Sequence, residues 1–329
     1  MAKQLTRDAS LLRKGAAPTN AWAFLNGEFV PIAEAKISVM THAFNYGTGV
    51  FEGIRAYWNG QQEQLFVLHL KDHYERMLRS CKIMRIELPY SVAQLSDITL
   101  EILRKCNYHE DAYIRPLAYK SSPLIGVRLH DLDDGFTVFA VPFGTYIDID
   151  RGISCCVSSW RRVDDNAIPA RSKITGSYVN AAVSKTEAQL NGYDEAIVLT
   201  QDGHVSEGSA ENLFMVKNGV LVTPPITDNI LEGITRRSLM ALATDELGLE
   251  VVERSIDRTE LYVADELFLC GTGAQVSGVI DLDRRAIGDG RVGPLTQRLS
   301  RLYFSAVRGE LPKYRNWVTP VYRRAKAAA

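Results

Sequence analysis

The segment Ala170-Arg171-Ser172-Lys173-Ile174-Thr175-Gly176-Ser177-Tyr178-Val179-Asn180 places one lysine in a short polar loop just before an alanine-rich helix. Most lysines are solvated surface charges, so a functional interpretation of Lys173 needs support from the surrounding sequence. An amine whose pKa is lowered can attack carbonyl groups, and several enzymes use a lysine in this way. Lys173 is therefore a candidate catalytic amine if the rest of the chain supplies its partners.

Three later stretches match the demands of one lysine-bound cofactor, pyridoxal phosphate. That cofactor needs an acid for its pyridine nitrogen, backbone N–H groups and a cation for its phosphate, and groups that fix its ring and 3-oxygen. Each stretch can meet one of these demands: Val205-Ser206-Glu207-Gly208-Ser209-Ala210-Glu211-Asn212-Leu213-Phe214, Leu231-Glu232-Gly233-Ile234-Thr235-Arg236 and Cys270-Gly271-Thr272-Gly273-Ala274. Taken singly, they are a hairpin, a helix start and a glycine turn.

Taken in order, the Lys173 loop, the Ser-Glu-Gly-x-x-Glu-Asn-Leu-Phe run and the Gly-Ile-Thr-Arg run resemble class IV pyridoxal-phosphate aminotransferases, and among these the branched-chain aminotransferases. The resemblance extends to Tyr-Gly-Thr-Gly-Val-Phe-Glu-Gly-Ile-Arg at 46–55 and Tyr-Ile-Arg-Pro at 113–116, and it spans roughly residues 24 to 310. It implies a two-domain α+β enzyme of fold type IV, like D-amino acid aminotransferase. It also implies at least a homodimer, in which the neighbouring subunit closes each site.

The pattern of turns and strands independently favours an α+β fold. Asn-Gly or Asp-Gly pairs at 26–27, 59–60, 202–203 and 218–219 predict β-hairpins. Apolar spacing predicts helices from about 72 to before Pro89 and from 92 to 106, both on one face of a sheet. In the second half it predicts strands at 153–158, 195–200, 204–207, 212–217, 220–223, 251–256 and 266–270, and helices from 177, 234 and 295. Hairpins of this kind are not typical of a doubly wound parallel sheet.

The change of pattern after residue 144 marks the predicted domain boundary. We expect a small N-terminal α+β domain over 1–146, an interdomain linker over 147–152, and a large C-terminal domain that binds the cofactor over 153–329. The resemblance places the cofactor at the junction of these domains.

By resemblance, Lys173 would carry the cofactor covalently and also move a proton, Glu207 would keep the pyridine nitrogen protonated, and Tyr178 would contact the 3-oxygen. The phosphate would be held by four residues, namely Arg76, Ile234, Thr235 and Thr272. From the residues alone, Glu211 competes with Glu207. Arg76 lies off the apolar face of its helix, which by itself predicts a surface arginine.

The substrate-binding residues implied by the resemblance are Tyr46, Phe51, Gly53, Arg55, Tyr113, Arg115, Tyr146, Gly273 and Ala274. Aromatic walls suit an aliphatic side chain, and an apolar pocket separates substrates that differ by one methylene by only ~1 to 3 kcal/mol. Leucine, isoleucine and valine would therefore all be accepted, with 2-oxoglutarate as the amino acceptor. Its distal carboxylate needs a cation, either Arg55 or Arg115, and we prefer Arg115 because Tyr113 shares its strand face.

Two details of the resemblance bear on the walls of the site. Phe143 stands where family members often carry tryptophan, which implies a slightly wider pocket. The segment Ser121-Ser122-Pro123-Leu124-Ile125-Gly126-Val127 is similar to the loop that reaches the neighbouring subunit, although an ordinary surface loop fits it equally well.

Other functions remain open at this point. D-amino acid or (R)-amine transaminases and aminodeoxychorismate lyases share the same cofactor machinery. A non-catalytic α+β binding protein, with Lys173 merely exposed, is a different class.

The amino-acid composition limits the classes of ligand and partner that we expect. With 329 residues and a formal net charge of -1, the chain has no basic excess that would favour nucleic acid or an anionic membrane, so small molecules are the expected ligands. No run approaches the roughly 18 apolar residues of a membrane span. Five cysteines without a C-x-x-C pair suit a reducing compartment, so we expect a cytoplasmic protein and no metal site.

Overall fold

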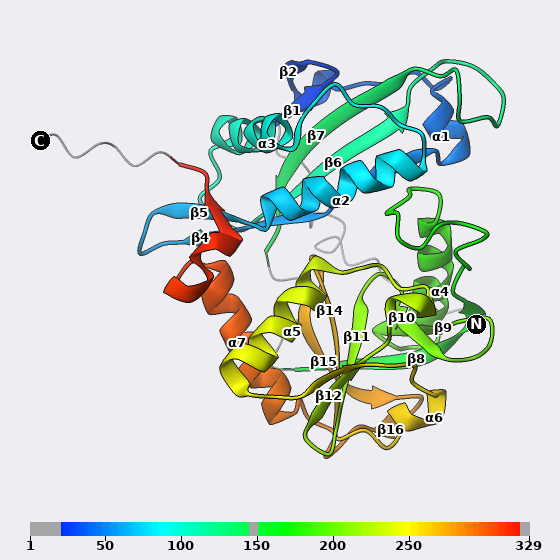
Figure 1. Cartoon of the computed structure of the whole chain (residues 1–329), viewed down its shortest axis with the longest axis vertical. Coiled ribbons are helices and arrows are strands. Elements are labelled where there is room, and N and C mark those ends of the chain that lie inside the picture. Colours follow the sequence, from blue (N-terminus) through cyan, green and yellow to red (C-terminus); the bar gives the residue numbers. More distant parts are fainter. Residues whose placement is uncertain (1–20, 145–150, 323–329) are drawn as a thin grey trace, which may run out of the picture.

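The first half of the chain folds into an antiparallel sheet in the computed structural model, which describes residues 21–144 and 151–322 (Figure 1). The sheet order is β17-β5-β4-β6-β7-β1-β2, with β3 paired to β6. Asn26 and Gly27 take positive φ between β1 and β2, as the Asn-Gly pair predicts. The strands are β1 (Trp22–Leu25), β2 (Glu28–Pro31), β3 (Gly49–Phe51), β4 (Ile54–Asn59), β5 (Gln64–Leu68), β6 (Ala112–Lys120), β7 (Asp134–Pro142) and β17 (Val318–Pro320).

Two amphipathic helices cover this sheet, α2 (Leu70–Ile83) and α3 (Val92–Cys106). Their buried side chains, among them Tyr74 and Leu95, share one apolar cluster with Ile54 and Ile114 of the sheet. The predicted bounds of α3 are confirmed, because Ser91 forms a capping box at its start. A short helix that the sequence did not predict, α1 (His42–Tyr46), precedes β3.

The second half forms a mixed sheet in the order β10-β9-β8-β15-β14-β11-β12-β13, with β16 paired to β15. Parallel pairing joins β8 to β9, β8 to β15 and β12 to β13, while the other pairs are antiparallel. The strands are β8 (Ile153–Arg161), β9 (Glu195–Leu199), β10 (Val205–Gly208), β11 (Asn212–Lys217), β12 (Val220–Thr223), β13 (Val251–Glu253), β14 (Glu266–Gly271), β15 (Gln275–Leu282) and β16 (Arg285–Ala286). The prediction of an α+β fold is confirmed, although the inner strand β15 was not predicted.

The remaining helices belong mainly to this second half: α4 (Tyr178–Leu190), α5 (Ile234–Leu247), α6 (Arg258–Leu261), α7 (Pro294–Val307) and the 3-10 turns Ile32–Glu34, Ile226–Asp228 and Pro312–Trp317. Among the described helices, none combines the length and the apolarity that a bilayer span requires. An apolar cluster joins Leu239 of α5 and Tyr303 of α7 to Tyr57 and Phe66 of the first sheet. One apolar cluster therefore spans both halves of the molecule.

The chain passes between the two sheets twice. The first passage follows β7, and residues 145–150, which include most of the linker predicted at 147–152, lie outside the described residues. The second passage leads from α7 to β17, which pairs antiparallel with β5 at the edge of the first sheet. There Val321 N donates to Leu65 O at 2.9 Å. β17 therefore completes the sheet that also contains β1 and β2.

Candidate active site

A cavity of about 550 Å³ lies between the two halves of the molecule and is lined by both. Most of the residues predicted for the site line it: Phe51, Gly53, Arg76, Tyr113, Arg115, Lys173, Tyr178, Glu207, Ile234, Thr235, Thr272, Gly273 and Ala274. Tyr46 and Arg55 are not among the lining residues, and Tyr146 lies outside the described residues. Six motifs from distant parts of the chain, together with Arg76, thus meet around one space.

The loop that carries Lys173 is held by the first half of the chain. Phe51 N donates to Lys173 O at 3.0 Å, and Gly176 N donates to Gly47 O at 3.1 Å. Gly47 has a φ of 67°, and a Cβ there would lie 2.7 Å from Gly176 Cα. Glycine at position 47 is therefore required by both its conformation and this close approach. The backbone on both sides of the lysine is fixed by segment 47–51.

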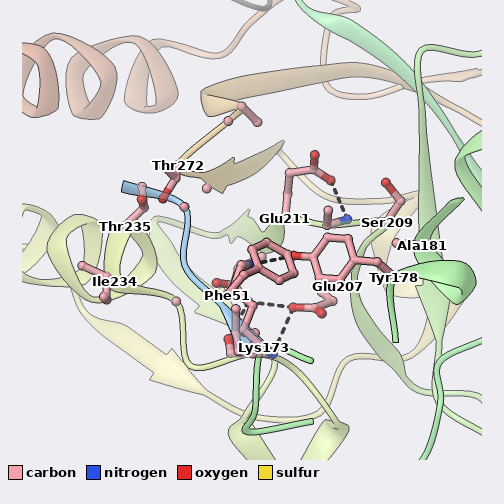
Figure 2. Close-up of a pocket in the computed structure, with 18 of the residues that line it drawn as sticks. Phe51, Lys173, Tyr178, Ala181, Glu207, Ser209, Glu211, Ile234, Thr235 and Thr272 are labelled. Atoms are coloured by element: carbon pink, nitrogen blue, oxygen red, sulfur yellow. Dashed lines mark hydrogen bonds between the residues drawn. The ribbon is translucent and has the colours of Figure 1, made fainter. Parts of the chain in front are cut away.

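The Lys173 side chain is half-buried and faces the cavity. Its Nζ donates to Tyr178 Oη at 2.5 Å and lies 5.0 Å from the centroid of the Phe51 ring. The Phe51 and Tyr178 rings meet edge to face, 4.7 Å apart. Figure 2 shows the amine beside these two rings. Lys173 is therefore an amine directed into a cleft, unlike the solvated charge of an average lysine.

A buried carboxylate belongs to the same cavity. Glu207, on β10, is 4% exposed, and its Oε1 lies 2.8 Å from Nη2 of Arg162. Its Oε2 accepts from Asn212 Nδ2 at 2.9 Å and from Leu231 N at 3.2 Å. Burial raises the pKa of Glu207, and the Arg162 and Lys173 charges oppose that effect. Glu207 is thus a fixed acceptor within the electrostatic reach of the Lys173 amine.

Glu211 also lines the cavity but has different neighbours. Its Oε2 accepts from Ala210 N at 3.0 Å. Burial, reinforced by the Glu195 carboxylate, raises the pKa of Glu211 to about 8, and Lys185 opposes the rise. Its largest electrostatic partners are the paired residues Glu195 and Lys185, with a smaller contribution from Glu207, and Lys173 is not among them.

The first turn of α5 forms another wall of the cavity. Gly233 is its N-cap residue and makes no side-chain cap, so the first N–H groups of the helix are available to a ligand. Ile234 and Thr235 lie in this turn, and Thr272 of the β14–β15 turn lies on the same side of the cavity (Figure 2). A helix N-terminus attracts anions through these N–H groups and its positive dipole end. This wall is suited to a phosphate.

Arg76 is buried, with 5% of its surface exposed, so the surface position predicted from the helix pattern alone was wrong. The helix face that carries Arg76 is covered by Glu52, whose carboxylate accepts two hydrogen bonds from the guanidinium. Arg76 Nη1 also donates to Glu232 O, just before α5. The arginine is thereby brought to the α5 side of the cavity.

A further part of the lining is aromatic and carries the cation Arg115. Arg115 Nη2 donates to Tyr113 Oη at 2.7 Å, and its Cζ lies 4.4 Å from the centroid of the Phe51 ring. A Cβ at Gly53 would lie 2.5 Å from Tyr113 Oη, so glycine at 53 leaves room for the phenol. β6 is an inner strand, so Arg115 does not face solvent at a sheet edge.

The two predicted substrate residues outside this lining have other partners. Arg55 is 1% exposed, and its Nη2 donates to Phe143 O at 2.6 Å and to Gly144 O at 2.8 Å. Tyr46, at the end of α1, accepts a hydrogen bond from Gly126 N at 3.2 Å. Arg55 therefore fixes the backbone after β7, and Tyr46 holds the loop that contains Gly126.

Sequence reasoning assigned no role to two charged residues of the site, Arg162 and Glu52. Glu52 lies inside a motif that was already quoted, so its position was a usable signal. Arg162 directly follows β8, and its partner Glu207 lies on β10, two strands away in the sheet. No local pattern links those positions.

Comparisons with known proteins agree with this geometry. A family model described as amino-transferase class IV matches residues 49–281. A probable branched-chain-amino-acid aminotransferase of Aquifex aeolicus is 52% identical over 301 residues, which cover 92% of this chain and 97% of that protein. The crystal structure of the branched-chain aminotransferase from the thermophilic archaeon Thermoproteus uzoniensis with norvaline has a TM-score of 0.88 and 45% identity, covering 92% of this chain and 99% of the other. That of Thermobaculum terrenum, in its PLP form, has a TM-score of 0.89 and 36% identity, covering 93% and 100%. The chain therefore belongs to the class IV aminotransferases, enzymes of fold type IV that depend on pyridoxal phosphate.

Proposed function

We propose that the protein is a branched-chain amino acid aminotransferase. It transfers the amino group reversibly between L-leucine, L-isoleucine or L-valine and 2-oxoglutarate. The observation that carries this proposal is the wall formed by Phe51, Tyr113 and Arg115, which combines aromatic surface with one cation. The names of the relatives support it, since the Aquifex and Thermobaculum proteins are both branched-chain aminotransferases.

The cavity fits pyridoxal phosphate on three counts: a buried carboxylate at Glu207, an uncapped helix start at Ile234 and Thr235, and a cleft-facing amine at Lys173. The cofactor would be held by Lys173, Tyr178, Glu207, Ile234, Thr235, Thr272 and Arg76. When bound, it supplies a carbonyl carbon that takes up an amino group and a ring that withdraws electrons. The binding roles of these residues, and the domain boundary at 147–152, are part of this proposal.

Lys173 has two tasks in this function. Its amine would hold the cofactor covalently, and when free it would accept a proton from the substrate Cα and hold it at Nζ. Oriented proton transfer of this kind typically accelerates a step by ~10²- to 10⁴-fold. Tyr178, whose hydroxyl accepts a hydrogen bond from Nζ, keeps the amine on the cleft side of the loop. Glu207 would stabilise positive charge on the ring nitrogen of the bound cofactor.

One pocket must accept both a branched aliphatic chain and the second carboxylate of glutamate. The aromatic rings of Phe51 and Tyr113 suit the aliphatic chain, and Phe139, Val141 and Phe143 extend the apolar lining. The carboxylate needs a charge-assisted partner. We assign that partner to Arg115, because it lines the cavity, while Arg55 does not line it and is bound to the backbone carbonyls of Phe143 and Gly144.

We predict that Arg115→Met reduces the half-reaction with glutamate by about 10- to 100-fold, because a lost hydrogen bond to a charge costs ~1.5 to 3 kcal/mol. The half-reaction with leucine should change by less than about 3-fold, since its contacts are apolar. Single-turnover rates with each amino acid, followed by cofactor absorbance, measure both effects. Arg55→Met serves as the matched control. If Arg55→Met, and not Arg115→Met, slows the glutamate half-reaction selectively, Arg55 binds the distal carboxylate.

The function as a whole is tested with a panel of amino donors against 2-oxoglutarate, using both enantiomers of each amine. Turnover of L-leucine, L-isoleucine and L-valine with no activity on D-amino acids or (R)-amines is the expected result. Preference for D-amino acids or (R)-amines would instead identify one of the transaminases that share this fold. Release of pyruvate from aminodeoxychorismate would identify the lyase.

We also propose that the enzyme is at least a homodimer and acts in the cytoplasm. Large apolar side chains around α1 and the loop after β6 are more than half exposed: Ile37, Val39, Phe44, Ile125 and Val127. Patches of this kind commonly mark protein interfaces. His42 joins the two segments, with Nε2 at 2.5 Å from Gly126 O, so the patch is held as one surface.

The dimer is tested by sedimentation velocity on the wild type and on Phe44→Asp. The wild type should sediment as a dimer or larger, and the charged variant should shift toward monomer and lose activity, since segment 121–127 would then no longer meet a neighbouring site. An active, monomeric wild type would contradict this part of the proposal.

A further inference from the structure

Glu52 is a buried carboxylate at the junction of β3 and β4 to which the proposed mechanism gives no task. It is 0% exposed. Its Oε1 accepts from Arg76 Nε at 2.8 Å, and its Oε2 accepts from Arg76 Nη2 at 2.7 Å. Nδ1 of His73 lies 2.8 Å from the same Oε2. Glu52 therefore holds one whole edge of the Arg76 guanidinium.

The charges in this cluster are fixed by their neighbours. Burial opposes ionisation of Glu52, but the Arg76 guanidinium and the His73 hydrogen bond outweigh it and lower its pKa to about 2. Burial also lowers the pKa of His73, so its ring is neutral near pH 7 and donates from Nδ1 to the carboxylate. The cluster thus holds one negative charge and one positive charge, which largely cancel.

The other end of the guanidinium reaches the second half of the molecule. Arg76 Nη1 donates to Glu232 O at 2.8 Å, two residues before α5 begins at Ile234. A guanidinium has five N–H groups, and the three contacts to Glu52 and Glu232 leave two for a ligand. Arg76 also lines the cavity together with Gly233 and Thr235. Its remaining N–H groups thus belong to the same wall as the first turn of α5.

We propose that Glu52 is a positioning residue for the phosphate of the cofactor, acting through Arg76. This inference rests on the proposed function, in which pyridoxal phosphate occupies the cavity. A free arginine side chain has many rotamers, and each one that must be frozen on binding weakens the complex. Because Glu52 already holds Nε and Nη2, the arginine rotamer is fixed before the ligand binds, and this entropic cost is not charged to binding. The remaining N–H groups of the guanidinium are left for the phosphate.

The direction in which Glu52→Gln changes phosphate affinity distinguishes a positioning role from a purely electrostatic effect of the carboxylate. Glu52→Gln removes a negative charge near the phosphate wall, so charge alone would make the variant bind a phosphate more tightly. Glutamine has one acceptor oxygen, and its amide N–H group faces the second guanidinium N–H group, to which it cannot bind. The two parallel hydrogen bonds to the Arg76 guanidinium therefore cannot both form. If orientation decides, the variant binds the phosphate more weakly in spite of its more positive site.

The test measures equilibrium binding of pyridoxal phosphate and of pyridoxal, which lacks the phosphate, to the apoenzyme by absorbance titration. For Glu52→Gln we expect affinity for pyridoxal phosphate to fall by about 10- to 100-fold, while affinity for pyridoxal changes by less than about 2-fold. On an Arg76→Met background, Glu52→Gln should cause no further loss. The control is Glu195→Gln, another buried and ion-paired glutamate, which lies outside the lining and should leave the ratio of the two affinities unchanged.

Equal losses for both ligands, or a loss that persists on the Arg76→Met background, would show that Glu52 has only a structural role. If Glu52→Gln does not fold, Arg76→Lys addresses the same question, because lysine keeps the charge but cannot form the fork. Arg76→Lys must then lose the preference for the phosphorylated ligand, and wild-type affinity would overturn the proposal. A wild type that binds pyridoxal phosphate no better than pyridoxal would instead contradict the proposed function itself.

Discussion

Lys173→Ala is expected to reduce transamination of leucine by more than about 10⁴-fold, because the substitution removes both the covalent anchor and the group that moves the Cα proton. The fold should survive. The backbone of this loop is held by hydrogen bonds from Phe51 N and Gly176 N, neither of which involves the lysine side chain. Steady-state rates and circular dichroism of the variant measure the two parts of this prediction.

Two other buried or half-buried lysines provide the controls. Lys185 Nζ is bound to Glu195 and Asp194 O, and Lys120 Nζ is bound to Arg85 O and Asp134. Lys185→Ala should therefore retain most of the activity. Borohydride reduction of the loaded enzyme, followed by peptide mapping, should place the pyridoxyl group on Lys173. An adduct on Lys185 or Lys120 would refute the assignment.

Glu207→Gln should retain bound cofactor yet lose about 10²- to 10³-fold in turnover, the size of effect found when a preorganised charge partner is removed from an active site. Glutamine can still accept from Asn212 Nδ2, so the local hydrogen bonding is partly preserved. It cannot stabilise a protonated ring nitrogen, and that is the property the reaction uses. Cofactor content by absorbance and steady-state kcat report the two outcomes separately.

Glu211→Gln is the matched control, because this glutamate lines the same cavity but interacts most strongly with Glu195 and Lys185 rather than with Arg162 and Lys173. We expect it to lower turnover by less than about 5-fold, since it removes no charge partner of the ring nitrogen. Equal losses in the two variants, or wild-type rates in Glu207→Gln, would contradict the choice of Glu207.

Features with a local cause could be predicted from the sequence. The hairpin of β1 and β2 turns at Asn26-Gly27 because those residues accept positive φ, and α3 begins where Ser91 caps it. Strand β15 was missed because Ser277 and Gly278 interrupt its apolar run. The structure explains the glycine, since a Cβ at Gly278 would lie 2.7 Å from Val292 Cγ1. That requirement comes from a residue that no local pattern connects to the strand.

The burial of Arg76 shows the same limit within the site. Helical periodicity correctly predicted that Arg76 lies off the apolar face of its helix. A polar residue outside the apolar face can nevertheless be buried when a carboxylate meets it there. Glu52, which lies on a different element, supplies that carboxylate. Likewise, the order of motifs along the chain indicated which residues meet, whereas the partners of Arg55 and Tyr46 became visible only in three dimensions.

The return of β17 to the first sheet has a consequence for biosynthesis. β5 pairs with β4 on one side and with β17 on the other, and Gln64 in β5 binds the backbone of Val321 and Tyr322. A chain emerging from the ribosome exposes β5 as an open edge until residues 318–320 have been made, and open edges invite pairing with other chains. Nascent chains that end before residue 318 should therefore depend on chaperones more strongly than chains that include β17.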